Sequence, residues 1–315
     1  MISFNMIDRY QNPEDKNFDI LFTALGYEQR CIFIPQKFEN KYKQGVCFQF
    51  QDRQQFSYLS NLEFYKNAGF DFIPWTGICN RDQLIELLMP IDTEDQEARI
   101  IQVAIDISAM NRQMVANIIY TLAHTSFKHD FEVSVLYAPA QYTDPVDEMP
   151  IMKIAGPVIP EYAGWYINPS DPLYAIIGLG YENGKALGIL EFLDVANAWL
   201  FKPLGSDESF INKVDAVNHD LISSLGQSKV INYKLSDPYD TFIKLQSLIE
   251  GLQKNNRIIL IPFGPKLFNV ICLILAEIYF DQIAVWRVSA GDQEQPKDHK
   301  ADETIISFVF RITQN

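Results

Sequence analysis

The stretch FDILFTALGYE (residues 18–28) has the pattern of a buried strand that ends in a glycine turn. Residues 18–24 are mostly apolar, which is typical of a strand covered on both faces of a parallel sheet. Gly26 then permits a sharp change of direction. The same four letters, LGYE, follow a second apolar strand, LYAIIG (residues 173–178), in the other half of the chain. The sequence therefore contains one strand-and-turn unit twice.

The two copies agree in register as well as in the order of their elements. Leu25 and Leu179 are 154 positions apart, and the same spacing separates Arg112 from Lys266. Each basic residue follows a strong apolar strand and stands at the head of a predicted helix. We therefore predict an internal duplication, with two lobes related by a pseudo-twofold axis and a cleft between them. The alternative is that any doubly wound chain repeats strand, turn and helix, and that one tetrapeptide coincided.

Strands alternate with helices in both halves, which predicts an α/β fold of two Rossmann-like βα lobes with mostly parallel sheets. We place the first lobe at residues 1–140 and the second at residues 173–315. Residues 141–172 contain six prolines and little periodicity, and we predict that they form a connector. The final apolar run, residues 305–312, is predicted to be a strand, antiparallel at an edge.

Composition limits the class of protein. The 315 residues are 48% hydrophobic and 21% charged, which fits a packed globular chain, and the net charge is −14. This acidic balance argues against a nucleic-acid polymer as the main partner, because such proteins present basic surfaces. The N-terminus lacks the features of a signal peptide, the most apolar stretch (residues 267–280) is too short to span a bilayer, and the four cysteines form no CxxC pair. We therefore expect a cytoplasmic protein that does not bind a membrane, a metal or a cofactor.

Two loops that follow the first strand of each half are candidate ligand-binding sites. In the first loop, Gly26 allows close backbone approach, Tyr27 offers a ring for stacking on a base, and Arg30 offers a planar fork for phosphate. The matching loop contains Gly180, Tyr181 and Lys185. The structural alternative is a glycine turn with a packing tyrosine and a solvated cation. Ligands of open parallel sheets bind at such loops, outside the carboxyl ends of the strands.

Two further loops follow the central strands. Asp106 ends an apolar strand and must be paired or hydrogen-bonded there, Ser108 is placed to start the next helix, and Arg112 lies in its first turn. A cation at a helix N-terminus opposes the helix dipole and favours an anion as partner. The alternative is that Asp106 and Arg112 only satisfy each other. In the second half, Gly264 makes the turn and Lys266 is a candidate phosphate donor.

These loops resemble those of the CARF-type Rossmann-like domains, which sense cyclic oligonucleotides in prokaryotic defence. Residues 106–112 (DISAMNR) look like the D-[IV]-[ST]-x-G-x-[RK] motif of that family, with Met110 in place of its glycine. Residues 264–266 (GPK) are similar to its G-T-K motif, with Pro265 in place of threonine. The related SAVED architecture fuses two CARF-like units in one chain. The resemblance implies a cyclic oligonucleotide as ligand and a role in antiviral defence.

Two hypotheses from different classes follow, besides a third possibility that the chain is a structural or scaffolding subunit whose pockets have decayed. The first is a module of a prokaryotic defence or signalling system that binds a small nucleotide-type anion in the cleft between the lobes. Its acidic, aromatic-rich surface also allows a protein partner of the same system. The second is an enzyme that processes nucleotides or nucleosides, such as a glycosidic-bond hydrolase or transferase, with Glu28, Glu182 or Asp106 as its carboxylate.

Overall fold

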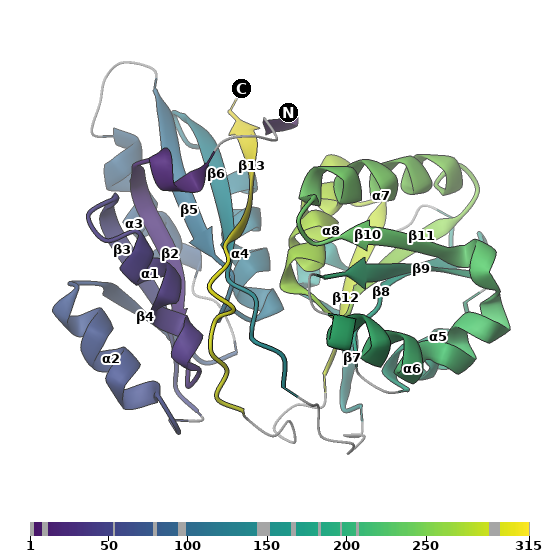
Figure 1. Cartoon of the computed structure of the whole chain (residues 1–315). Coiled ribbons are helices and arrows are strands. Elements are labelled where there is room, and N and C mark those ends of the chain that lie inside the picture. The colour runs from purple at the N-terminus through teal and green to yellow at the C-terminus, as the bar shows by residue number, and fades with distance from the viewer. Residues whose placement is uncertain are drawn as a thin grey trace. The chain divides into compact units, whose positions relative to one another are not determined.

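The computed structural model shows an α/β chain that divides into two compact units (Figure 1). Unit 1 comprises Met1–Gln141 and Pro296–Asn315, and unit 2 comprises Tyr142–Gln295. The structure describes residues 3–7, 12–52, 54–77, 81–93, 99–143, 152–164, 168–181, 184–195, 197–205, 208–289 and 297–314.

Unit 1 is built on a seven-stranded sheet with the order β1-β13-β6-β5-β2-β3-β4. Its strands are β1 (Ser3–Ile7), β2 (Phe18–Leu25), β3 (Tyr42–Phe50), β4 (Asp71–Trp75), β5 (Ile100–Asp106), β6 (Asp130–Tyr137) and β13 (Ile306–Thr313). The five strands from β6 to β4 are mutually parallel, whereas β13 is antiparallel to both β6 and β1. The sheet is therefore a parallel core closed by two antiparallel strands.

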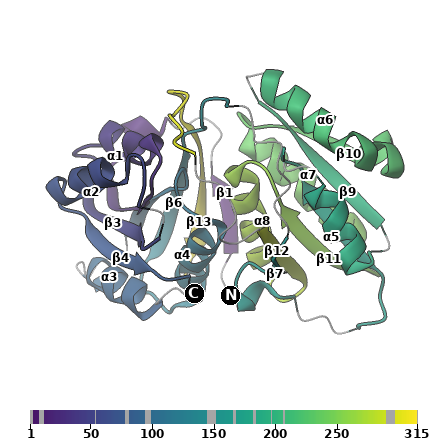
Figure 2. The same cartoon turned by 90° about the horizontal axis from the view of Figure 1, so that it is seen from below.

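Helices cover both faces of this sheet. The helical segments of unit 1 are η1 (Pro13–Asp15), η2 (Gln29–Ile32), α1 (Phe33–Lys37), α2 (Tyr58–Asn67), α3 (Arg81–Thr93) and α4 (Arg112–His124). Figure 2 shows α1 and α2 on one face and α3 with α4 on the other, and α3 packs against α4. Helix α4 begins where the Asn111 side chain accepts a hydrogen bond from the Met114 amide at 2.9 Å.

Unit 2 is built on a six-stranded sheet with the order β10-β9-β8-β11-β12-β7. Its strands are β7 (Ile154–Pro157), β8 (Leu173–Gly178), β9 (Asn197–Leu204), β10 (Val230–Lys234), β11 (Arg257–Pro262) and β12 (Ile283–Ser289). Its helical segments are η3 (Pro160–Tyr162), α5 (Lys185–Leu193), α6 (Glu208–Leu225), η4 (Gln227–Lys229), α7 (Pro238–Leu252) and α8 (Lys266–Ile278). Only β7 runs antiparallel to its neighbour, β12. Within this unit α5 packs against α6, and α7 packs against α8.

The central strands β5 and β11 form the middle of two apolar cores. Both strands are buried almost throughout because helices cover each face of their sheets. Helix α8 is buried over eleven consecutive residues, from Leu267 to Glu277. A helix with apolar side chains on every face is expected in such a position. Most of the apolar stretch at residues 267–280 therefore lies in a buried helix.

The predicted fold class is confirmed, and the two units share one strand order. In unit 1 the parallel strands run β4-β3-β2-β5-β6, and in unit 2 they run β10-β9-β8-β11-β12. Each run is followed by an antiparallel strand. Helices α4 and α8, which follow the central strands, begin 154 positions apart, at Arg112 and Lys266. Duplication itself stays a prediction, because this strand order also occurs in doubly wound sheets generally.

The antiparallel strands show where the predicted second lobe was wrong. We expected residues 173–315 to form it, but β13 pairs with β6 from Ile306–Tyr137 to Ile312–Phe131 and so belongs to unit 1. β13 is not an edge strand either, because β1 lies on its other side. Likewise β7, inside the predicted connector, pairs with β12 of unit 2. Each of these closing strands, β7 and β13, thus follows the last parallel strand of the other unit in the chain. β7 comes after β6 and pairs with β12, and β13 comes after β12 and pairs with β6.

Two further strands of unit 2, β9 and β10, were not predicted. β9 contains Pro203, which lacks an N–H for the ladder and is therefore atypical of a strand between two others. It nevertheless lies between β8 and β10 in a parallel arrangement. β10 is a short strand at the edge of the sheet and has only one buried residue, Tyr233. In β9 the apolar run is only four residues long, from Ala198 to Phe201, and that of β10 is shorter still, so neither gives a strong strand signal in sequence.

No helix in the described part of the chain combines the length and the apolar character needed to cross a membrane.

Phe310 tests the place of β13 in the first sheet. This side chain is completely buried, so Phe310→Ala should lower the free energy of unfolding by about 3–5 kcal/mol. Denaturant unfolding monitored by circular dichroism would measure the change. Phe192→Ala is the matched control, because that ring is 67% exposed, and it should alter stability by no more than about 0.5 kcal/mol. Equal effects of the two substitutions would contradict the placement of β13.

Candidate functional site

Each parallel sheet has one point where the strand order reverses, and such points are where open α/β sheets bind ligands. In unit 1 the reversal lies between β2 and β5, and in unit 2 it lies between β8 and β11. The loops that follow these four strands contain all the predicted ligand-binding residues. The site in each unit is therefore described from these two loops outward.

In unit 2, a lysine begins each of the two helices that start at the reversal point. Lys185 is the first residue of α5, after β8, and Lys266 is the first residue of α8, after β11. Strands β8 and β11 are direct neighbours, from Leu173–Arg257 to Gly178–Pro262. Two cationic helix starts thus flank one position at the carboxyl edge of the sheet, where backbone N–H groups also lack partners within their helices.

The two loops of unit 2 are in close contact through Gly264. This residue has a left-handed backbone, with φ of +66°, and a Cβ added to it would collide with the carbonyl oxygen of Leu179. Glycine is needed here for both reasons. The helix after this loop begins at Lys266 with Pro265 as its N-cap. The other loop contains buried Gly180 and Tyr181, which is 41% exposed, and Glu182 lies outside the described residues.

In unit 1, Arg112 likewise begins α4, but Asp106 lies inside the protein. Asp106 is completely buried at the end of β5. Its Oδ1 accepts the Ser108 amide at 2.9 Å and its Oδ2 accepts the Thr23 hydroxyl at 3.3 Å. The Thr23 hydroxyl is also 3.0 Å from the hydroxyl of Tyr65 on α2. These bonds satisfy both oxygens of the Asp106 carboxylate. Asp106 therefore belongs to a hydrogen-bond network inside the protein and is not exposed to a ligand.

Ser108 does not start helix α4, contrary to our prediction. Its side chain is buried, and its hydroxyl accepts the amide of Ala138 at 2.9 Å. This bond joins the loop after β5 to the end of β6. Asn111 takes the N-cap instead, because its side chain is three residues before the Met114 amide that it accepts. Ser108 therefore fixes the loop that presents Arg112.

Arg30, the predicted phosphate fork, is buried and forms an ion pair with Glu28. Burial disfavours the charged guanidinium, but the adjacent Glu28 carboxylate and smaller contributions from Tyr137 and Cys31 together raise the pKa of Arg30. Its Nη1 also donates to the carbonyl of Ala138 at 3.4 Å, and its amide donates to the carbonyl of His299 at 3.1 Å. Arg30 and Glu28 thus connect the turn after β2 to the end of β6 and to the segment before β13.

The two LGYE turns are held from behind by buried asparagines. In unit 1, the Asn61 amide donates to the carbonyl of Gly26 at 3.0 Å and to that of Glu28 at 2.9 Å. In unit 2, the Asn218 amide donates to the carbonyl of Gly180 at 2.8 Å. Each asparagine lies on the second helix of its unit, α2 or α6. One side-chain type therefore satisfies the same turn carbonyl in both units.

The tyrosine of each LGYE turn packs against a phenylalanine. Tyr27 lies with its ring centroid 6.1 Å from that of Phe56, and Tyr181 lies 6.2 Å from Phe210. Phe56 and Phe210 are 154 positions apart, the same spacing as the turns themselves. Both follow the next strand of their sheets, β3 or β9, and therefore lie at the carboxyl edge. Sequence reasoning missed both phenylalanines and both asparagines, although the shared spacing of the phenylalanines was legible.

The cysteines whose side chains are described are internal. Cys31, Cys47 and Cys272 are buried free thiols, and Cys79 lies outside the described residues. Burial, together with the nearby Glu28 carboxylate, raises the pKa of Cys31 to about 12. A thiol with so high a pKa is a poor nucleophile near neutral pH. Among the described residues, no group of three or more His, Cys, Asp and Glu side chains is arranged to hold a metal ion.

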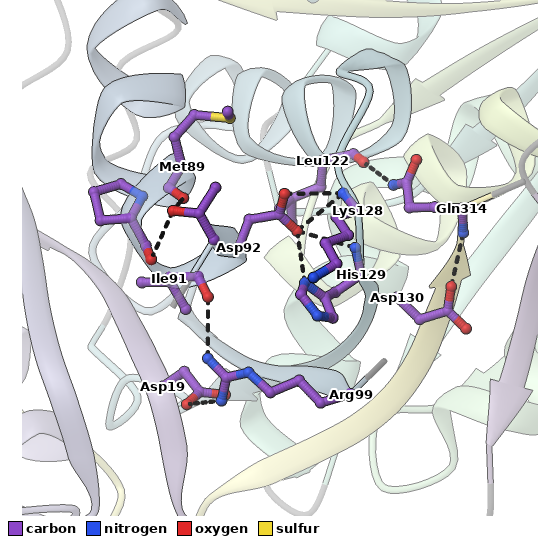
Figure 3. Close-up of polar contacts among 12 residues, drawn as sticks. Asp19, Met89, Ile91, Asp92, Arg99, Leu122, Lys128, His129, Asp130 and Gln314 are labelled. Atoms are coloured by element: carbon purple, nitrogen blue, oxygen red, sulfur yellow. Dashed lines mark hydrogen bonds and ion pairs between the residues drawn. The ribbon is translucent and has the colours of Figure 1, made fainter. Parts of the chain in front are cut away.

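A second polar cluster lies at the opposite, amino edge of the first sheet (Figure 3). Asp92 on α3 accepts the amides of Lys128 and His129 and contacts His129 Nδ1 at 3.1 Å. Near it, Arg99 pairs with Asp19 at 3.1 Å and donates to the carbonyl of Ile91 at 3.0 Å. Burial opposes ionisation of Asp19, but the Gln102 amide and two cations lower its pKa. These bonds join α3 to the starts of β2, β5 and β6, so the cluster holds elements together.

Comparisons with known proteins add little to this geometry. No protein-family model and no curated protein matches the chain. Among solved structures, it is similar to one described as the adenylation, ketoreductase and pseudo Asub multidomain structure of a keto acid-selecting NRPS module. The identity is 11%, the TM-score is 0.19, and the match covers 88% of this chain but only 34% of that one. A likeness at this level carries no argument, so the function rests on the chain's own residues.

Gly264 tests the contact between the two loops of unit 2. Gly264→Ala should destabilise the protein by about 1–2 kcal/mol for the left-handed backbone alone, with a further loss from the collision with Leu179. Gly251→Ala in α7 is the matched control, because no atom lies within 4 Å of its Cβ position. The control should be neutral or stabilising, since alanine favours a helix. Thermal unfolding of both variants would show whether they differ in this direction.

Asn61 tests how the first LGYE turn is held. Asn61→Ala leaves the buried carbonyl of Gly26 without its donor and should lower stability by about 1–3 kcal/mol. Asn67→Ala, an exposed change on the same helix, is the control and should have little effect. Denaturant midpoints would give both values. A midpoint for Asn61→Ala equal to that of the control would mean that the turn does not depend on this amide.

Proposed function

We propose that the chain binds a small nucleotide-type anion at the carboxyl edge of its parallel sheets. The observation that carries the proposal is the pair of lysines in unit 2, Lys185 and Lys266, which begin the two helices at the reversal point. A cation in the first turn of a helix is unfavourable on its own, because it adds to the positive end of the dipole. Two such cations at the ends of neighbouring strands favour an anion, which the N–H groups of both helix starts would also bind.

Unit 1 supports the proposal with a weaker form of the same arrangement. Arg112 begins α4 in the position of Lys266, but the loop after β2 starts a short 3-10 segment and its Arg30 is paired with Glu28. Unit 1 therefore has one helix that begins with a cation at its reversal point, whereas unit 2 has two. We infer that unit 2 contains the stronger anion site.

The net charge of −14 is compatible with this site, because a small anion needs only a few local donors. The carboxylates named for the enzyme hypothesis are engaged or lie outside the described residues. Asp106 is buried, Glu28 is paired with Arg30, and Glu182 is not among the described residues. Binding is therefore the function that the geometry supports best. The resemblance of these loops to CARF-type domains makes cyclic oligonucleotides of prokaryotic defence systems the first ligands to test.

Calorimetric titration of the full chain with AMP and with cyclic oligoadenylates tests the proposal. Lys185→Gln and Lys266→Gln should each weaken binding about tenfold or more, since each removes a charge-assisted contact. Arg112→Gln should have the same kind of effect on any second, weaker binding event. Affinity should also fall as salt is raised.

The matched controls are Lys66→Gln and Lys254→Gln. Both lysines are exposed and carry the same charge, but they lie at the amino edge, at the end of α2 and in the turn after α7. They should leave binding unchanged. The proposal is abandoned if no ligand of this panel binds, or if the control substitutions weaken binding as much as Lys185→Gln and Lys266→Gln do.

A further inference from the structure

Each unit presents a pair of aromatic rings at its carboxyl edge, with the same spacing in sequence and nearly the same separation in space. Phe56 follows Tyr27 by 29 positions, and Phe210 follows Tyr181 by 29 positions. The ring centroids are 6.1 Å and 6.2 Å apart, with interplanar angles of 57° and 38°. Tilted rings at this separation attract each other.

Packing within unit 1 does not account for Phe56. Its ring is 59% exposed, and its backbone has a φ of +47°, a left-handed conformation that is costly for a bulky residue. A polar residue or glycine would suit this position better on both counts. Strained, exposed aromatic residues that persist beside a ligand edge point to binding.

The first pair is held in place by hydrogen bonds on both sides. The Ser57 amide donates to the carbonyl of Tyr27 at 3.2 Å, which ties the segment of Phe56 to the LGYE turn. Asp298, from the segment before β13, then bridges the two segments. It accepts the Gln29 amide at 2.7 Å and the Ser57 hydroxyl at 3.0 Å. The rings therefore have a fixed platform before any ligand arrives, which lowers the entropic cost of binding.

The second pair gains a third ring. Tyr142 lies edge-on to Phe210, with centroids 4.8 Å apart and an interplanar angle of 86°. Phe210 is thus packed between two tyrosines, while Tyr181 keeps 41% of its surface exposed. Behind this group the Asn218 amide fixes the carbonyl of Gly180. Unit 2 therefore has the more enclosed platform, on the loops that also lead to Lys185.

We propose that the Tyr27–Phe56 and Tyr181–Phe210 pairs bind the base of a nucleotide by stacking. This inference rests on the proposed function and assigns its base subsite. A planar heteroaromatic ring is the occupant that fits, because it can lie on the exposed face of one ring and meet the edge of the other. Stacking tolerates any base, so the platform selects for the presence of a base and leaves the choice of base to other contacts.

Saturation-transfer NMR and calorimetry on the full chain separate the base from the phosphate. Adenosine and uridine contain a base without a phosphate, and ribose 5-phosphate contains a phosphate without a base. Phe56→Leu with Phe210→Leu keeps the apolar bulk and removes the phenylalanine ring from each pair; variants without these two phenylalanine rings are called ring-free. It should weaken binding of both nucleosides by about tenfold or more, as expected for the loss of a stacked ring, and leave ribose 5-phosphate unaffected.

Leu59→Ala with Leu187→Ala is the matched control, because these side chains are also apolar and exposed, at 71% and 42%, on α2 and α5. It should leave nucleoside binding unchanged. Because the left-handed backbone at residue 56 suits glycine, Phe56→Gly with Phe210→Ala provides a second ring-free variant whose folding can be confirmed by circular dichroism.

The outcomes separate this inference from the proposed function. Ribose 5-phosphate binding without nucleoside binding would overturn the base platform and keep the anion site. Nucleoside binding that the ring-free variants lose, without ribose 5-phosphate binding, would support the platform and overturn the anion site. Wild-type affinity for nucleosides in both ring-free variants would overturn the platform. If none of the three probes binds, both proposals fall.

Discussion

A buried amide that satisfies a turn carbonyl is the interaction on which both candidate sites depend. The turn after the first parallel strand of each unit buries the carbonyl of a glycine, and a buried carbonyl without a donor is costly. Asn61 and Asn218 supply that donor from the second helix of their units. Because the donor lies on a helix packed against the sheet, the turn cannot change shape independently of that helix. The tyrosine that follows the glycine is thereby presented from a rigid support.

The two units use this shared frame differently. In unit 1 the loops are linked to the interior, since Asp106 is buried below them and Arg30 is neutralised by Glu28. In unit 2 the corresponding positions are Leu260 and Gly184, which make no such ionic links, and lysines begin both helices. The loop after the central strand also differs, because Gly264 allows close contact with the neighbouring turn where unit 1 has buried Met110. The loops at the carboxyl edge of unit 1 are therefore stabilised by internal bonds, whereas those of unit 2 are suited to bind an anion.

The sequence predicted the parts of the fold that depend on local patterns. The strands β2, β5, β8 and β11 are apolar runs bounded by turns, and the helices after the central strands follow directly from them. The strand partners of β7 and β13 could not be predicted from the sequence. Antiparallel pairing with a distant segment leaves no local pattern. In the same way, the loops at the carboxyl edges were found from glycine and charge. The role of Asn61 could not be predicted, because nothing in the sequence shows that its side chain donates to the carbonyl of Gly26. Phe56 precedes α2 and has a left-handed backbone, which no local pattern indicates for a phenylalanine.

The closing strands also set the order in which the protein can form. In the described part of the chain β1 pairs with β13 alone, so its partner comes from beyond unit 2, and β6 has one open edge until β13 arrives. Unit 2 is one continuous segment, whereas unit 1 needs both ends of the chain. During synthesis, which proceeds from the N-terminus, the parallel strands of unit 1 emerge before unit 2, but their sheet is completed only when β13 follows unit 2. An unpaired edge strand is a template for aggregation, so the nascent chain is most vulnerable between the release of β6 and that of β13.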